Sequence, residues 1–349
     1  FSGNGSGSIT RTATAATLTT ALASMTYQSG LNNNNNNTAA GSRTLNVTAV
    51  NNTNGGSSTP SQVISITPVN DPPVNTVPGA QVVLEDEPLV ISGASVSDVD
   101  VAEGTGNLSL QITANNGVVA LATDVVSGVT SAQITVTDSN DITVVATPTA
   151  INNTLAAANC LRYQGFLNFA GADTVTFTLS DLGNTGSGGT LTDTDNIGIT
   201  VTAVNDPPTV TNQVGLATED VNTAIPGVGV TDVDAASGTL NLTLAANRGD
   251  LSATAQGTAS VGGNGTATLT ITGNLTDMNS TLNTLFYLSE LNDNALVPVT
   301  ATINDNGNTG TGGGTNIIRQ FSIGVSPVND APVITSPASA VGQDGVPIP

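Results

Sequence analysis

The pentapeptide Val-Asn-Asp-Pro-Pro occurs twice in this chain, at Val69–Pro73 and Val204–Pro208, and Val-Asn-Asp-Ala-Pro follows at Val328–Pro332. We call these motifs the first, second and third joints. The aspartates of consecutive joints are separated by 135 and 124 residues. A motif that recurs at domain-sized intervals indicates a tandem array, in which one unit ends where the next begins.

The joints divide the chain into four segments. Two of them are complete units, and the others resemble parts of a unit. The first segment has the pattern of a closing half only, and the last has the pattern of an opening only. The expected segments are the closing half of a repeat at 1–69, complete repeats at 70–204 and 205–328, and the first strand or strands of a further repeat at 329–349.

Acidic residues recur at fixed places in the opening half of each complete unit. A Glu-Asp pair follows the joint aspartate by 15 residues in one unit and by 14 in the next, and an Asp-Val-Asp motif then follows at the same distance in both. Spacing kept between units indicates a shared structural role. The pairs are Glu85-Asp86 and Glu219-Asp220, and the Asp-Val-Asp aspartates are Asp98, Asp100, Asp232 and Asp234.

The closing halves contain a helical pattern followed by alternating strands. Leu275, Met278, Leu282 and Leu285 have helical spacing, with counterparts in the other units. Apolar residues then alternate with threonine, as strands with one buried face do. The helical spacing covers residues 15–25, 151–161 and 275–285, and the predicted helices end at Tyr27, Tyr163 and Tyr287. We expect these tyrosines to be core residues whose hydroxyls bond to the backbone.

Composition excludes several classes of function. Five basic residues, all arginine, oppose 26 acidic ones, for a net charge of −21, so nucleic acid and anionic membrane are poor partners. Histidine is absent, which excludes His-dependent catalytic triads and zinc sites. The recurring acids are copied once per unit, as linkers are and active sites seldom are. We therefore expect no enzymatic activity.

The motifs resemble those of cadherin-type repeats. Thr176–Gly183, a final strand and Val204–Pro208 are similar to the closing segment of such repeats, Asp-Val-Asp is similar to their Asp-x-Asp, and Glu85 lies where they have an early glutamate. The match is closest to bacterial cadherin-like tandem repeats of large secreted adhesins and surface fibres. The resemblance implies an all-β fold of tandem cadherin/Ig-like antiparallel β-sandwich domains, each with one short inserted helix.

The resemblance also implies Ca²⁺ at the joints, because Ca²⁺ takes several oxygen ligands in irregular geometry. The linker lacks the first aspartate of the family pattern, so one or two ions per joint are expected. The implied metal ligands around the first joint are Asn70, Asp71, Asp98, Asp100 and Asp181. Those around the second joint are Glu85, Asn205, Asp206, Asp232, Asp234 and Asp305.

Three functions remain open. The first is a Ca²⁺-rigidified rod within a secreted bacterial surface fibre or giant adhesin. The second is a filament subunit joined to identical subunits by strand exchange. The third is a non-catalytic carbohydrate-binding module of a secreted enzyme, which the lack of tryptophan disfavours. We expect an extracellular or cell-surface location and contacts with other repeats or identical subunits. Any binding of surface glycan or protein would use regions outside this chain.

Overall fold

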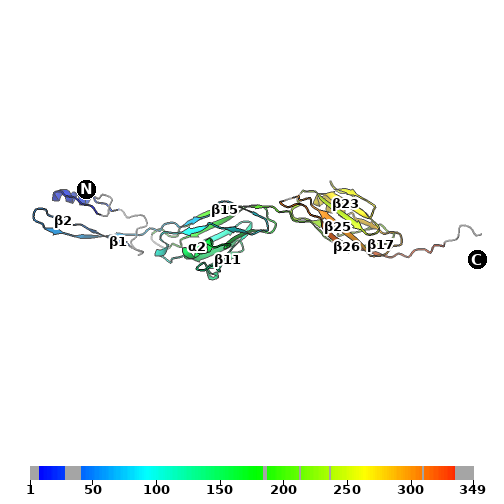
Figure 1. Cartoon of the computed structure of the whole chain (residues 1–349), viewed down its shortest axis with the longest axis horizontal. Coiled ribbons are helices and arrows are strands. Elements are labelled where there is room, and N and C mark those ends of the chain that lie inside the picture. The colour runs from blue at the N-terminus through cyan, green and yellow to red at the C-terminus, as the bar shows by residue number, and fades with distance from the viewer. Residues whose placement is uncertain are drawn as a thin grey trace, which may run out of the picture. The chain divides into compact units, whose positions relative to one another are not determined.

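The computed structural model describes residues 8–27, 41–183, 187–211, 214–235, 237–308 and 310–334. It contains two β-sandwiches, preceded by a segment with one helix and paired strands (Figure 1). The predicted all-β class is confirmed, and so is the single short helix in each complete sandwich. The four segment boundaries remain predictions. The acidic-pair position of the last segment, Gln343-Asp344, lies outside the described residues.

The N-terminal segment forms separate short elements. Helix α1 begins after Thr14, whose hydroxyl caps it by accepting a hydrogen bond from the Thr17 amide. Strands β1 and β4 pair in antiparallel register, with Leu45 opposite Gln62. The elements are α1 (Ala15–Ala23), β1 (Gly41–Asn46), β2 (Ala49–Val50), β3 (Ser57–Ser58) and β4 (Ser61–Ile66).

The first sandwich combines a six-stranded sheet, in the order β11-β12-β9-β14-β15-β6, with a three-stranded sheet, β10-β13-β7. The alternation predicted for its long closing strand is confirmed, since Val175, Phe177 and Leu179 are buried while the threonines between them are half-buried. The elements are β5 (Val74–Thr76), β6 (Gln81–Leu84), β7 (Leu89–Ile91), β8 (Ser95–Ser97), β9 (Leu108–Ala114), β10 (Gly117–Leu121), β11 (Ile134–Asp138), β12 (Asp141–Ala146), α2 (Pro148–Ala156), β13 (Leu161–Gly165), β14 (Gly171–Ser180) and β15 (Thr192–Thr202).

The second sandwich has the matching topology, with a six-stranded sheet, β17-β26-β25-β20-β23-β22, and a three-stranded sheet, β18-β24-β21. Its strand pairs are antiparallel except β17 with β26, which run parallel. The elements are β16 (Thr209–Thr211), β17 (Gly215–Thr218), β18 (Thr223–Ala224), β19 (Gly229–Thr231), β20 (Leu240–Ala246), β21 (Asp250–Ser252), β22 (Ser260–Gly262), β23 (Thr268–Gly273), α3 (Leu275–Leu282), β24 (Phe286–Leu288), β25 (Val297–Asn304) and β26 (Ile317–Ser326).

The predicted ends of the helices are wrong. Helix α2 ends at Ala156 and α3 at Leu282, so Tyr163 and Tyr287 lie in the strands that follow, β13 and β24. Apolar spacing continued past the helix because the next strand buries its own residues at a compatible interval. Ala157 already has the extended backbone conformation that ends α2.

The core position of two tyrosines is confirmed, since Tyr163 and Tyr287 are both 0% exposed. The Tyr287 hydroxyl donates to the Arg248 carbonyl at 3.3 Å, as expected. Tyr163 differs, because its hydroxyl donates at 2.7 Å to the buried carboxylate of Asp173. That carboxylate also accepts hydrogen bonds from the Asn115 and Asn116 amides, so both of its buried oxygens have hydrogen-bond donors.

Candidate metal centres at the joints

Strand pairing brings the acidic motifs of a unit to one end of its sandwich. Strand β16 follows the second joint, and it pairs antiparallel with β19, with Thr209 opposite Thr231. The residues before β16 therefore lie beside the residues after β19, which are Asp232 to Asp234. Asp305 directly follows β25 in the same sandwich. The register of the sheet thus assembles residues that are up to 100 positions apart in sequence.

Hydrogen bonds connect the acids of the second joint. The Asp206 amide donates to Asp234 Oδ2 at 2.9 Å, and the Asp234 amide donates to Asp232 Oδ1 at 3.2 Å. The Asn205 carboxamide donates to Asp305 Oδ2 at 2.7 Å. The structure therefore brings together five residues that the family resemblance implied as ligands.

The first joint has the same arrangement. The Asp71 amide donates to Asp100 Oδ2 at 3.0 Å, and the Asp100 amide donates to Asp98 Oδ1 at 3.0 Å. Asn70 donates from its Nδ2 to Asp181 Oδ2. Asp181 is 0% exposed, and its other oxygen accepts from two backbone amides. The same hydrogen-bond geometry therefore occurs in both sandwiches.

Several buried oxygen atoms in both joints have no hydrogen-bond partner. In the first joint they include Asn70 Oδ1 and Asp98 Oδ2. In the second they include Asn205 Oδ1, Asp206 Oδ2 and Asp232 Oδ2. A buried acceptor without a donor costs free energy, and a carboxylate costs more than an amide. An oxygen-only donor set of this kind fits a hard cation such as Ca²⁺, which would satisfy these atoms directly.

Glu85 lies beside the second joint. Its amide donates to the Thr202 carbonyl at 2.9 Å, and its Oε1 accepts from the Val204 amide at 2.6 Å. Residues Val82–Glu87 belong to the same compact unit as Thr200–Pro349. Its neighbour Asp86 was not predicted as a ligand, but burial, Asp86 and Asp234 together raise the pKa of Asp206. The Glu-Asp pair therefore contributes two carboxylates to this region.

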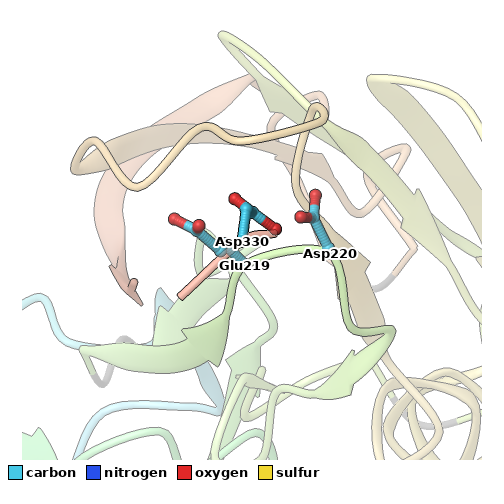
Figure 2. A group of neighbouring side chains, drawn as sticks. All are labelled: Glu219, Asp220 and Asp330. Atoms are coloured by element: carbon cyan, nitrogen blue, oxygen red, sulfur yellow. The ribbon is translucent and has the colours of Figure 1, made fainter. Parts of the chain in front are cut away.

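A third acidic group lies beside the third joint (Figure 2). One carboxylate oxygen from each of Glu219, Asp220 and Asp330 lies within 4.8 Å of the others. Glu219 is 3% exposed, and its Oε2 has no hydrogen-bond partner. We did not predict these residues as ligands, although the repeated Glu-Asp pair and the third Val-Asn-Asp motif contain the signal.

One glycine is required where a loop passes the second joint. Gly310 has φ +97°, and a Cβ there would lie 2.7 Å from the carbonyl carbon of Val204. We expect Gly310→Ala to destabilise the second sandwich by about 1–3 kcal/mol, because it adds both backbone strain and overlap. Urea unfolding would measure this loss. Gly313→Ala is the matched control, since nothing lies within 4 Å of its Cβ, and an equal loss in both variants would contradict the explanation.

Protonation should affect stability when no cation is bound. Burial is the main cause that raises the pKa of Asp98 to about 6, and the neighbouring Asp100 adds to the shift. Burial likewise raises the pKa of Asp232 to about 6, with Asp234 as the neighbouring group. The folded state then holds more protons than the unfolded state between about pH 4 and pH 6, so its stability falls as pH rises through that window. Melting temperatures in cation-free buffer should therefore be higher at the acidic end of the window. Asp232→Asn should reduce this dependence of the melting temperature on pH. A melting temperature that rises with pH in cation-free buffer would contradict the explanation.

Similarity to known proteins is confined to solved structures. No family model matches the chain, and no curated protein matches it. Among solved structures, extracellular cadherin domains 3–6 of protocadherin gamma B2 match at 14% identity and a TM-score of 0.26, covering 78% of this chain and 57% of that one. Mouse cadherin-23 EC22-24 matches at 15% identity and a TM-score of 0.29, covering 83% and 75%. Human protocadherin-24 EC1-2 matches at 11% identity and a TM-score of 0.30, covering 73% and 98%. TM-scores of this size carry no argument about family or function.

Within the described parts of the chain, no helix combines the length and the apolar character that crossing a membrane requires.

Proposed function

We propose that this chain is a structural segment of a secreted bacterial surface fibre or adhesin, a rod of tandem repeats that Ca²⁺ stiffens at its joints. The observation that carries the proposal is the pair of matching oxygen-lined centres at the first and second joints, each with buried acceptors that lack a donor. An array without internal covalent links needs another means of fixing its joints, because the single cysteine excludes an internal disulfide.

The proposed chemistry is charge neutralisation. Without a cation, the carboxylates of a joint repel one another and favour separation. The chain's own residues prepare the site, because Asp305 fixes the Asn205 carboxamide through its nitrogen and leaves the amide oxygen for the metal. Glu85 would add a ligand from the preceding repeat, while Asp232 and Asp234 come from the following one. A cation held by both would restrict bending at the joint.

Calorimetric titration and small-angle X-ray scattering would test this function. We expect calorimetry to detect binding of Ca²⁺ to the full chain. We expect scattering to show a narrower distribution of the radius of gyration in Ca²⁺ than in chelator. Glu85→Gln should weaken binding at one joint by about tenfold or more, because affinity depends on the number of charged ligands. Glu87→Gln is the matched control, since Glu87 is exposed two residues away. Absence of binding heat, or scattering that Ca²⁺ leaves unchanged, would disprove the proposal.

A further inference from the structure

The N-terminal strand pair has the same register as the closing strand pair of a complete repeat. Gln62 precedes the aspartate of its joint by nine residues, as Phe321 does. Leu45 lies opposite Gln62 in β1 and β4, and Val299 lies opposite Phe321 in β25 and β26. The two pairs are therefore equivalent strand for strand.

The edge of β1 differs from its counterparts. In the second sandwich, β25 also pairs with β20 on its other side, with Ala301 opposite Leu244. In the first sandwich, β14 pairs with β9 in the same way, with Phe177 opposite Ile112. Across the described part of the chain, β1 pairs with β4 alone. Its second row of backbone donors and acceptors is an edge that can accept a strand.

The side chains that a complete repeat buries are exposed in this segment. Tyr27 is 48% exposed, whereas its equivalents Tyr163 and Tyr287 are 0% exposed. Met25 is 39% exposed, and the equivalent leucines Leu161 and Leu285 are 1% exposed. Helix α1 has no buried residue, whereas α2 and α3 each bury three. Both the helix and the sheet therefore lack the layer that covers them in the other repeats.

We propose that β1 and α1 form a docking surface for the opening half of a repeat of this type, meaning a segment with the chemistry of residues 70–146. A strand like β9, Leu-Ser-Leu-Gln-Ile-Thr-Ala, would pair antiparallel with β1 and place its apolar residues beside Leu45 and Val47, on the same face of the sheet. Tyr27 and Met25 would then be buried. This form of recognition adds a strand to an open edge and selects it by the side chains of one face.

The occupant must bring an opening half that is not already paired. In this chain β9 lies between β12 and β14, and β20 lies between β23 and β25. A second copy of the chain would have to unfold one of its own sandwiches to supply either strand. We therefore assign the surface to an additional opening half. This inference does not depend on metal binding at the joints.

An insertion of the missing half tests the proposal in the full chain. A copy of residues 70–146 is inserted directly before Arg11, because Arg11 precedes Tyr27 by 16 residues, as Thr147 precedes Tyr163. Nitration of tyrosines, followed by mass spectrometry, reports exposure at each site. We expect nitration of Tyr27 to slow by about tenfold or more relative to the unmodified chain, because a buried residue reacts only when the structure opens locally.

A matched insert provides the control. It carries Leu110→Asp and Ile112→Asp in the inserted copy only, so that charged residues replace the apolar contacts of the added strand. This insert should leave Tyr27 as reactive as in the unmodified chain. Equal reactivity of Tyr27 in all three proteins would overturn the proposal, and so would equal protection by both inserts. A dimer of the unmodified chain with Tyr27 already protected would assign the surface to a second copy and would also overturn it.

Discussion

Chelation of divalent cations should lower the melting temperature of this chain by roughly 10 °C, since a ligand at a hundred times its dissociation constant stabilises the folded state by about 2.7 kcal/mol per site. The physical reason lies in the buried oxygens of the joints, which have no donor of their own. Differential scanning calorimetry in Ca²⁺ and in chelator would measure the difference.

Single substitutions should locate this effect. Asp206→Ala and Asp232→Ala should each remove most of the effect that chelator has on melting through the second joint. Asp206 Oδ2 and Asp232 Oδ2 are among the buried atoms without a hydrogen-bond partner. Asp124→Asn is a suitable control, since Asp124 is exposed and does not recur between repeats. Identical melts of the unmodified protein with and without chelator would refute metal stabilisation.

Phe177→Ala should be the most destabilising single change in the first sandwich, with a loss of about 3–5 kcal/mol. Phe177 is 1% exposed on β14, opposite Ile112 of β9. Removing the ring leaves a cavity that the surrounding sheet cannot close. Chemical denaturation would measure this loss, and Phe166→Ala should cost little because Phe166 is 45% exposed.

The second sandwich suggests a rescue of this variant. It carries Ala301 at the position of Phe177, and Phe321 at the position of Ile197 on the neighbouring strand. Phe321 is 6% exposed, so the ring enters the same core from the adjacent position. Adding Ile197→Phe to Phe177→Ala should therefore recover part of the lost stability. A double variant no more stable than Phe177→Ala would show that the two cores are not interchangeable in this way.

Local pattern was sufficient where a residue's role depends on its neighbours in sequence. The alternation of Val175, Phe177 and Leu179 identified a half-buried strand, because successive side chains of a strand point to opposite faces. The same reasoning placed helix α3 from the spacing of Leu275, Met278 and Leu282. It failed at Leu285, which lies beyond the helix, because periodicity does not reveal where a helix gives way to a strand.

The candidate centres show a similar division. Spacing between repeats identified the recurring acids Asp98 and Asp232, and the family resemblance implied that they converge at the joints. Asp173 has no counterpart in the other repeat, so no repeated spacing pointed to its burial against Tyr163. The cluster of Glu219, Asp220 and Asp330 was overlooked because ligands were assigned only around the first two joints.

By itself, the sequence determined the repeat, its acidic joints and the all-β class, because these follow from local residue spacings that recur along the chain. Only the tertiary structure decided which oxygens are buried without a donor, and which strand of the N-terminal segment has an open edge. Those properties depend on strand register and on contacts between residues far apart in the chain. No local pattern of amino acids encodes them directly.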